Sequence, residues 1–443
     1  MSGIAEVLIN QGYEVTGSDL ARSPVTAHLE KIGAKIYFGH RRENIQDAQV
    51  VVASTAVKPD NVEVDAARKL MVPVIPRAEM LAELMRMKHG IAIAGSHGKT
   101  TTTSLVATVL AEGKLDPTVI VGGKLKSIGS HAKLGKSEFI VAEADESDGA
   151  FMRLSPAIAV VTTLDKEHMD FYGTMENLKD AFLDFLNRIP FYGVAVLCLD
   201  DHNIQSLIPK LEKRYVTYGL VSQADFTARN ISADGLRTSF DVYLQSKKLG
   251  RVQSAIHGRH NILNSLAAVA VGMEMNLDFE VVAEALKGFT GVHRRFEIIH
   301  ESASLIMVDD YGHHPTEIEV TLRTAKEIWP DRKLVAVFQP HRYSRTKLLL
   351  KEFCSAFNDA DHLVVTGIHP GGEDPIEGVN GGQIAAGVKN FGHKSVAYFE
   401  DKKDAYDHLL KIVQPGDAVI TLGAGNVWEL GRDFLANLPE RFR

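Results

Sequence analysis

The residues best suited to chemistry lie within residues 91–103, where a short apolar run leads into glycines, a lysine and four threonines. Gly95 and Gly98 would let backbone N–H groups close around phosphate oxygens, because glycine readily adopts positive φ. Lys99 would meet the β- and γ-phosphates of a nucleotide, and the Thr100 hydroxyl would bind Mg²⁺. This pattern predicts a binding site for a nucleoside triphosphate.

The spacing of this loop departs from the strict phosphate-loop pattern, which has a glycine five residues before Gly98. Ile93 occupies that position, so the loop is a shortened Gly-x-x-Gly-Lys-Thr. An ordinary strand-to-helix turn is the alternative interpretation. The apolar run before the loop and the helix expected over residues 104–112 favour the phosphate loop. We therefore expect Ser96, His97 and Thr101 to join the nucleotide site.

Two polar clusters follow expected strands in the same region. The first, residues 143–148, reads Glu-Ala-Asp-Glu-Ser-Asp directly after an apolar strand. Carboxylates at the carboxyl end of a strand suit a hard cation such as Mg²⁺, although a solvated acidic loop is the alternative. The second, residues 165–170, places His168 among acids. The pattern favours a metal site but does not indicate which carboxylate coordinates the metal. For His168, a ligand role and a structural role are equally compatible with the sequence.

Three further polar clusters come later in the chain. Asn261 and Asn264 lie three residues apart at an expected helix start, where they would either cap the helix or hydrogen-bond a base or ribose. Residues 294–297 and 309–315 form the next cluster. Arg342 and Arg345 follow an expected strand, and two such arginines favour binding of a carboxylate or phosphate over a solvated loop.

Composition limits the classes of function. The chain has 443 residues, of which 45% are hydrophobic and 24% charged, as in ordinary globular proteins. Its net charge of −7 argues against general nucleic-acid or anionic-membrane binding. We expect neither a signal peptide nor a membrane span, and a cytoplasmic location. Cys198 and Cys354 lie in apolar contexts, which predicts buried free thiols in a reducing compartment.

Alternating helical and extended patterns predict an α/β protein of three domains. Residues 1–88 form a small Rossmann-like domain that begins with a helix and lacks the strand expected before it. Residues 89–291 form the nucleotide-binding domain, with an antiparallel excursion over residues 224–256. Residues 292–443 form a second Rossmann-like domain, whose strands include residues 304–308.

Together these motifs resemble the Mur ligase family over essentially the whole chain. The most specific matches are residues 95–103, 143–148, 257–261, 309–315 and 341–346. The resemblance implies a first domain for the UDP-sugar, a middle domain for ATP and a last domain for the amino acid. It implies ATP-dependent ligation of L-alanine to the carboxylate of UDP-N-acetylmuramate through an acyl phosphate, in peptidoglycan precursor synthesis. ATP and Mg²⁺ are the implied cofactors.

The resemblance also assigns roles to individual residues. Lys99 and Thr100 match contacts to phosphates and Mg²⁺, and Glu143 and His168 match metal-binding positions. Asn261 and Asn264 match the adenine side, and Arg295 and Asp310 match positions near the nucleotide. The region that receives L-alanine and the muramyl carboxylate is matched by Tyr311, His313, Arg342 and Arg345. His313 is also the candidate general base. Candidate contacts to the UDP-sugar are Ser18, Asp19, Ser54, Ala56 and Arg77.

The chain departs from the family at its beginning. Mur ligases open with a strand and a glycine-rich loop that holds the UDP pyrophosphate, and this sequence starts just past that loop. We expect a natural start upstream or a shortened first domain, with weak UDP-sugar binding in the second case.

Three other functions remain as alternatives. A ligase that adds a preformed tripeptide to the same sugar is the close rival, although residues 310–314 and 341–345 favour the alanine enzyme. A phosphate-loop switch or kinase would not need two further α/β domains with polar clusters of their own. A degenerate protein that only senses the UDP-sugar is the third alternative.

Overall fold

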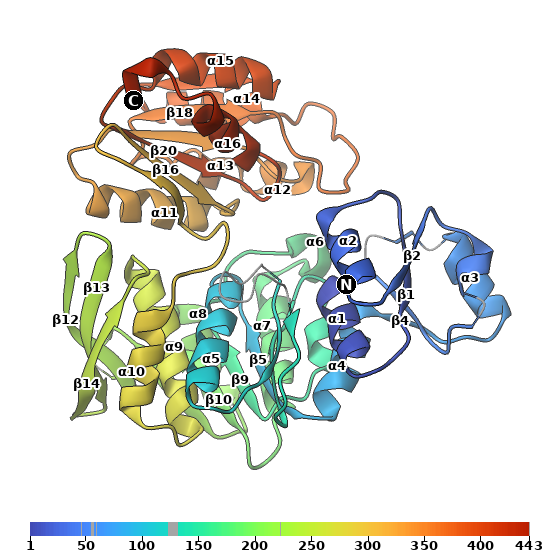
Figure 1. Ribbon diagram of the computed structural model, residues 1–443. Coiled ribbons are helices and arrows are strands. Elements are labelled where there is room, and N and C mark those ends of the chain that lie inside the picture. The colour runs from blue at the N-terminus through green and yellow to red at the C-terminus, as the bar shows by residue number, and fades with distance from the viewer. Residues whose placement is uncertain (46, 55–56, 59, 123–131, 222, 443) are drawn as a thin grey trace. The chain divides into compact units, whose positions relative to one another are not determined.

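The computed structural model describes residues 1–45, 47–54, 57–58, 60–122, 132–221 and 223–442. The chain divides into two compact units, Met1–Thr290 and Gly291–Arg443. Helices and parallel strands alternate through both, which confirms the α/β fold class (Figure 1). Within the described ranges, no helix combines the length and the apolar character that crossing a bilayer requires.

A ten-stranded sheet forms the centre of the first unit. Its strands, in spatial order, are β14 (Lys247–Ser254), β13 (Arg237–Leu244), β12 (Phe226–Asp234), β11 (Tyr215–Gly219), β10 (Val194–Cys198), β9 (Ile158–Val161), β5 (His89–Ala94), β8 (Phe139–Glu143), β6 (Thr118–Ile120) and β7 (Ala132–Lys133). β5 pairs in parallel with β8 on one side and β9 on the other. The loops after these three strands therefore meet at one edge of the sheet.

Helices pack on this sheet and bury its apolar strands. They are α5 (Lys99–Glu112), α6 (Met169–Tyr172), α7 (Met175–Asn187), α8 (His202–Gln205), α9 (Arg259–Glu274) and α10 (Phe279–Gly288). α5 packs against α9 and α10 (Figure 1). This packing buries even the polar start of α5, where Thr102, Thr103 and Ser104 are fully covered. The strands β12, β13 and β14 pair in antiparallel fashion, which confirms the expected excursion.

Residues 1–88 carry two small parallel sheets instead of one larger sheet. β1 (Thr16–Asp19) pairs with β2 (Lys35–Phe38), and β3 (Val51–Ala53) pairs with β4 (Val74–Pro76). Their helices are α1 (Ser2–Asn10), α2 (Pro24–Lys31), α3 (Val62–Lys69) and α4 (Arg77–Arg86). A polar cluster links the two sheets: the Ser18 hydroxyl on β1 donates to Glu63 on α3 at 2.5 Å.

The second unit contains a six-stranded sheet. Its spatial order is β15 (Glu297–Glu301), β16 (Leu305–Asp310), β20 (Asp417–Leu422), β17 (Leu334–Phe338), β18 (His362–Thr366) and β19 (Val396–Phe399). Every pairing is parallel except β15 with β16. The helices are α11 (Pro315–Ile328), α12 (Tyr343–Leu348), α13 (Leu350–Phe353), α14 (Gly381–Asn390), α15 (Lys402–Ile412) and α16 (Trp428–Ala436). Apolar side chains cover both faces of the sheet.

Several boundaries differ from the sequence prediction. α5 begins at Lys99 and not at residue 104, because Gly98 turns the chain with φ 81° directly before it. Glu143 is the last residue of β8, and β16 continues through Asp309 and Asp310, so these carboxylates lie in strands and not in loops. Cys198 is buried, but Cys354 is only half-buried, since α13 is a short helix near the surface.

Candidate active site

Three loops meet at the carboxyl edge of the first unit's sheet. They follow β5 (residues 95–98), β8 (residues 144–149) and β9 (residues 162–168). The sequence predicted a polar cluster after each strand, and the parallel order β9-β5-β8 brings the clusters together. This edge, on both sides of the central strand, is where open α/β sheets bind ligands.

The phosphate loop needs glycine at both predicted positions. Gly95 has φ 127° and Gly98 has φ 81°, values that side-chain-bearing residues rarely adopt. A Cβ on Gly95 would lie 2.2 Å from the Thr162 hydroxyl, and one on Gly98 would lie 2.7 Å from Asn264 Oδ1. The loop is therefore held tightly against β9 and α9. Lys99 and Thr100 then form the first turn of α5, where free N–H groups and the helix dipole favour an anion.

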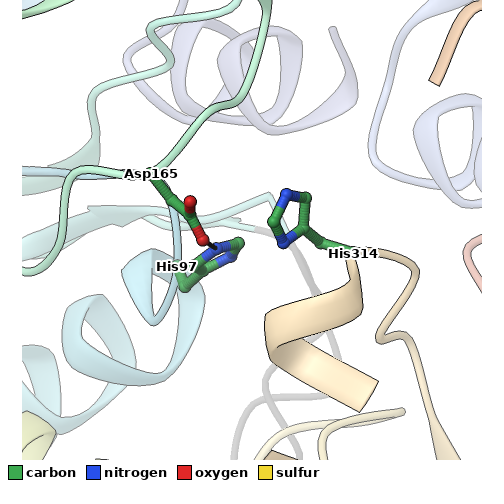
Figure 2. Close-up of side chains that lie close together, drawn as sticks. All are labelled: His97, Asp165 and His314. Carbon is green, nitrogen blue, oxygen red and sulfur yellow. Dashed lines mark hydrogen bonds and ion pairs between the residues drawn. The ribbon is translucent and has the colours of Figure 1, made fainter. Parts of the chain in front are cut away.

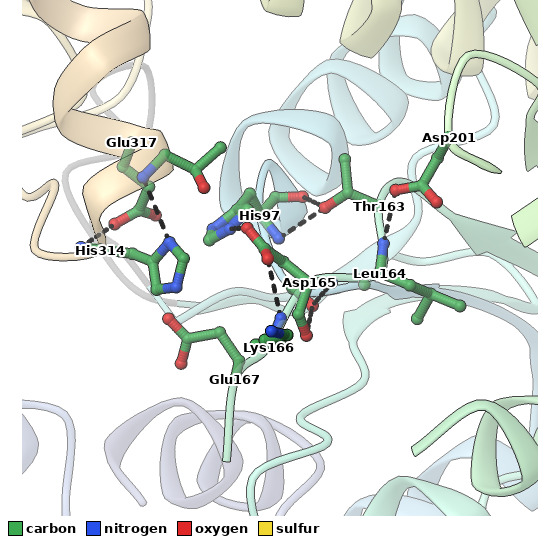
Figure 3. A network of polar contacts seen from close by, with 12 residues as sticks. His97, Thr163, Leu164, Asp165, Lys166, Glu167, Asp201, His314 and Glu317 are labelled. Carbon is green, nitrogen blue, oxygen red and sulfur yellow. Dashed lines mark hydrogen bonds and ion pairs between the residues drawn. The ribbon is translucent and has the colours of Figure 1, made fainter. Parts of the chain in front are cut away.

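The loop after β9 anchors the phosphate loop through hydrogen bonds. Ser96 N donates to Thr163 O at 2.8 Å, His97 N donates to Thr163 Oγ1 at 2.9 Å, and the Thr162 hydroxyl donates to His97 O at 2.5 Å. His97 Nε2 also lies 3.0 Å from Asp165 Oδ2 (Figures 2 and 3). Main-chain groups make most of these contacts, so the loop has a defined shape before any ligand binds.

Leu164, the next residue of the loop after β9, is also held by hydrogen bonds. Leu164 N donates to Asp201 Oδ2 at 2.9 Å, and Asn203 Nδ2 donates to Leu164 O at 2.8 Å (Figure 3). Asp201 also caps α8, because its side chain accepts from Asn203 N and Ile204 N. The phosphate loop is therefore supported by two successive layers of fixed groups.

Lys99 extends along its own loop to an acid of the β8 loop. Its ammonium donates to Gly95 O at 2.6 Å, to Ser96 O at 3.3 Å and to Glu146 Oε1 at 2.9 Å. Burial opposes the charge of Lys99, but the carboxylate of Glu146 outweighs it and raises the pKa of Lys99. The lysine is therefore charged at neutral pH, as recognition of a phosphate requires.

Glu146 is the most enclosed acid of this edge, with 1% of its side chain exposed. Burial raises its pKa to about 7, although Lys99 acts in the opposite direction. Its main-chain oxygen accepts from the Tyr172 hydroxyl at 2.5 Å, which fixes the segment against α6. His168 Nε2 lies 3.9 Å from Glu146 Oε1.

The two predicted adenine-side asparagines are buried at the start of α9. Asn264 Nδ2 donates to Asn261 Oδ1 at 3.0 Å, and Asn264 Oδ1 accepts from the Thr102 hydroxyl on α5 at 3.1 Å. Asn261 Nδ2 donates to His257 O at 2.7 Å. The pair therefore faces one side of α9, as its spacing predicted, and connects α9 to the first turns of α5.

The predicted metal ligands can be judged by their donor atoms. The Thr100 hydroxyl and the Glu143 carboxylate are oxygen donors of the kind that Mg²⁺ takes, and both belong to elements that end or begin at this edge. The imidazole of His168 suits Mg²⁺ less well, because nitrogen is a softer donor. His168 has φ 56° and directly precedes α6. The residues therefore fit a magnesium ion held mainly by oxygen and water.

The polar cluster of the second unit forms around Asp310. This buried carboxylate accepts from Phe296 N at 2.6 Å and from Gly312 N at 2.7 Å, and burial raises its pKa to about 6 while Arg295 lowers it. The guanidinium groups of Arg294 and Arg295 each lie 5.1 Å from the centre of the Tyr311 ring. Asp310 thus fixes the main chain directly after two of the predicted residues, Arg295 and Tyr311.

Glu317 fixes the turn that follows. Its carboxylate accepts from His313 N at 3.0 Å and from His314 N at 3.3 Å, at the start of α11 (Figure 3). Arg295 Nη1 lies 3.7 Å from the same carboxylate. Glu317 therefore positions the predicted residues His313 and Arg295 together.

Three histidine rings join the loops of this sheet edge. His313 packs edge-on against His341 with ring centres 5.6 Å apart, and His341 stacks on His369 at 5.4 Å. Burial lowers the pKa of His341 to about 3, and neighbouring cationic groups add to the effect. Arg345 donates to His341 O at 3.3 Å, and Arg342 N donates to His369 O at 2.9 Å. The predicted arginines thus lie at the start of a helix beside a stacked pair of histidine rings.

A pocket of about 320 Å³ opens beside these rings. His369, Gln339 and Asn426 contribute to its lining. Two hydrogen bonds join these amide residues: the main-chain N–H of Asn426 donates to Gln339 Oε1 at 2.9 Å, and Gln339 Nε2 donates to Asn426 Oδ1 at 3.1 Å. The carboxyl edge of this sheet therefore offers room and polar groups for a small ligand.

Comparison with known families agrees with this geometry along the chain. Residues 1–89 match the model described as Mur ligase family, catalytic domain; residues 93–272 match the Mur ligase middle domain; residues 294–425 match the Mur ligase glutamate ligase domain. The chain belongs to the Mur ligase family. The matched middle segment begins within β5, the strand that leads into the phosphate loop.

Curated relatives cover nearly the whole chain. It is 56% identical over 441 residues to the UDP-N-acetylmuramate–L-alanine ligase of Geobacter sulfurreducens, covering 99% of this chain and 96% of that one. It is also 56% identical to the enzyme of the same name from Syntrophotalea carbinolica, with 100% and 96% coverage.

Solved structures of Mur ligases share the fold. The UDP-N-acetylmuramate–alanine ligase of Thermotoga maritima matches with a TM-score of 0.83 and 30% identity, covering 99% of this chain and 96% of that one. The murein peptide ligase of Psychrobacter arcticus matches with a TM-score of 0.73 at 24% identity, with 99% and 96% coverage, which shows a common fold.

The predicted UDP-sugar contacts lie in the first 88 residues of this Mur ligase. Ser18 is engaged with Glu63 and lies 3.0 Å from His40 Nδ1, whereas Asp19 is exposed at the end of β1. Ser54 follows β3, and Arg77 begins α4. Ala56 lies outside the described residues. Their roles stay predictions, as do the three domain boundaries.

The sequence prediction omitted the acids that hold the predicted residues in place. Glu146 holds Lys99, Asp165 contacts His97, Glu317 fixes His313 and Glu63 binds Ser18. Glu146 and Asp165 stand in the polar clusters already noted, so their position after strands was a usable signal. Glu317 and Glu63 lie in amphipathic helices, where acidic residues are common on solvent-facing sides.

Proposed function

We propose that this Mur ligase joins L-alanine to the carboxylate of UDP-N-acetylmuramate at the expense of ATP, an early step of peptidoglycan precursor synthesis. Identity above 50% to curated UDP-N-acetylmuramate–L-alanine ligases, over nearly their full length, carries the proposal. The enclosed phosphate loop with its charged lysine supports the use of ATP.

The first chemical step is activation of the muramyl carboxylate. A carboxylate oxygen attacks the γ-phosphorus of ATP, ADP leaves, and an acyl phosphate forms. Lys99 and the first N–H groups of α5 stabilise the charge on the phosphoryl oxygens. Thr100 and Glu143 would hold Mg²⁺ in the bound state, where the ion neutralises phosphate charge.

The second step forms the amide bond. The neutral amine of L-alanine attacks the acyl carbon, inorganic phosphate leaves, and the amine loses a proton. Arg342 and Arg345 hold the carboxylate of L-alanine through charge-assisted hydrogen bonds. Tyr311 and His313 lie on the loop after β16, and His313 is the candidate proton acceptor. Asn261, Asn264, Arg295 and Asp310 lie toward the nucleotide in this proposal.

The test is phosphate release from ATP with UDP-N-acetylmuramate, with and without L-alanine, followed by product mass. We expect release that depends on both substrates and a product heavier by one alanine residue. Turnover with the tripeptide L-alanyl-γ-D-glutamyl-meso-diaminopimelate in place of L-alanine would identify the rival activity. Phosphate release without any ligated product would identify a nucleotide hydrolase.

A further inference from the structure

All three donors of the Lys99 ammonium are already engaged within the protein. A lysine carries three N–H donors and no acceptor. Here they contact Gly95 O, Ser96 O and Glu146 Oε1, at 2.6, 3.3 and 2.9 Å. A phosphate that approaches Lys99 must therefore replace at least one of these acceptors.

Glu146 is the acceptor that can leave. Gly95 O and Ser96 O belong to a loop whose main chain is fixed by Thr162 and Thr163, so they cannot withdraw without moving the whole loop. Glu146 reaches Lys99 through a side chain with rotatable bonds. Its carboxylate is also the only one of the three acceptors that can ionise and carry a full negative charge, as phosphate does.

A second observation is that the carboxylate of Glu146 is incompletely hydrogen-bonded where it lies. In the part of the chain that the structure describes, its Oε2 atom is buried and accepts no hydrogen bond. A buried acceptor without a partner costs free energy, so this carboxylate is poorly satisfied apart from its contact with Lys99.

We propose that Glu146 is a positioning residue that occupies the phosphate position at Lys99 in the nucleotide-free enzyme and gives it up when ATP binds. The proposal rests on the proposed ATP site. In this proposal Glu146 competes with the nucleotide for Lys99. It also supports the nucleotide-free loop, because its contact keeps Lys99 extended toward the phosphate position until ATP binds.

The charge of Glu146 should therefore weaken nucleotide binding. Glu146→Gln keeps the size of the side chain and an oxygen that accepts from Lys99, but it removes the negative charge. We expect the Kd for ATP, measured by calorimetry in EDTA, to fall about tenfold, which corresponds to about 1.4 kcal/mol. Asp145→Asn is the matched control, because this carboxylate is exposed on the same segment and accepts from Ser147 N. Its effect should be much smaller.

A double-mutant cycle shows whether the effect passes through Lys99. In a Lys99→Ala background, Glu146→Gln should no longer tighten ATP binding, since the competing pair is absent. Tightening that persists there would assign the effect to general repulsion and overturn the proposal. Glu146→Asp, which withdraws the carboxylate by one methylene, should also tighten binding and serves if the glutamine variant fails to fold.

Other outcomes separate the remaining explanations. Unchanged binding in EDTA with weaker binding of Mg·ATP would make Glu146 a metal ligand and overturn the proposal. Unchanged or weaker binding in both conditions, in a variant with native circular dichroism, would leave only a structural role and also overturn it. Failure of the wild-type enzyme to bind ATP at all would instead contradict the proposed function.

Discussion

Two regions can be compared: the phosphate loop of the first unit, and the loops after β16 and β17 in the second unit, which carry His313, His341 and Arg342. Both regions lie at the carboxyl edge of a sheet of mainly parallel strands, but they are built differently. In the phosphate loop, main-chain groups and two threonine hydroxyls make most of the contacts. In the second unit, the buried carboxylate of Asp310 and the half-buried carboxylate of Glu317 hold the turns, and histidine rings and guanidinium groups lie between them.

Under the proposed function, this difference matches two tasks of recognition. Phosphate is the same in every nucleotide, so a rigid main-chain cradle suits it. An amino-acid substrate must be distinguished from its relatives, and side chains provide that discrimination. The first site should therefore be sensitive to backbone changes, and the second to changes of side chain and charge.

The largest effect is expected from removing the lysine side chain at the phosphate loop. Lys99→Ala should lower kcat by roughly 10²- to 10³-fold, because the charge on the transferred phosphoryl group loses its cation. Steady-state phosphate release measures this. Lys287→Ala is the control, since Lys287 forms a surface pair with Glu284 on α10. A fall of less than threefold for Lys99→Ala would contradict the proposed site.

Gly95→Ala tests the main-chain cradle. The new Cβ would meet Thr162 Oγ1 at 2.2 Å, and the residue would be held at φ 127°. We expect a loss of about 1–3 kcal/mol in the free energy of unfolding, with weaker ATP binding. Gly235→Ala is matched, because Gly235 has φ 52° and no atom within 4 Å of its Cβ position. Equal losses in both variants would show that the close approach to Thr162 has no effect.

Arg345→Ala tests side-chain recognition in the second unit. Loss of a charge-assisted contact of about 1.5–3 kcal/mol should raise the KM for L-alanine by roughly tenfold to a hundredfold. The KM for ATP should change little. Arg323→Ala, at an exposed position on α11, is the control. Equal changes in the KM of all three substrates would contradict a specific role at the amino acid.

The last expected effect is a dependence of the second unit's stability on pH. The folded-state pKa of Asp310 is raised to about 6, so its protonated form favours the fold, and this stability is lost as pH rises from about 4 through 6. Asp310→Asn should remove up to about 2–3 kcal/mol of this dependence.

Tryptophan fluorescence during urea unfolding measures that dependence, since both tryptophans, Trp329 and Trp428, lie in the second unit. Asp331→Asn, at an exposed position, is the control. An unchanged pH profile for Asp310→Asn would show that ionisation of this buried carboxylate does not affect unfolding.

The sequence by itself determined the fold class and the local motifs. Apolar runs followed by glycine, acid or arginine identified the strands and the loops after them, and the spacing of Asn261 and Asn264 placed both on one face of α9. Such features depend on a few neighbouring residues, so they can be recognised in the chain. The boundaries of elements were predicted less exactly. Helix α5 starts at Lys99 because Gly98 provides a left-handed turn, whereas the low helix propensity of the four threonines had suggested a later start.

Only the tertiary structure decided which acid meets which hydrogen-bonding partner. Glu146 lies 47 residues from Lys99, Asp165 lies 68 residues from His97, and Glu63 lies 45 residues from Ser18. The first two pairs form because β5 pairs in parallel with β8 and β9, which sets their loops side by side. In the third, the fold brings Glu63 on α3 to Ser18 on β1. Strand order is fixed by the sum of many apolar contacts, and no local pattern encodes it. The charged partners of the predicted residues therefore became visible only with the fold.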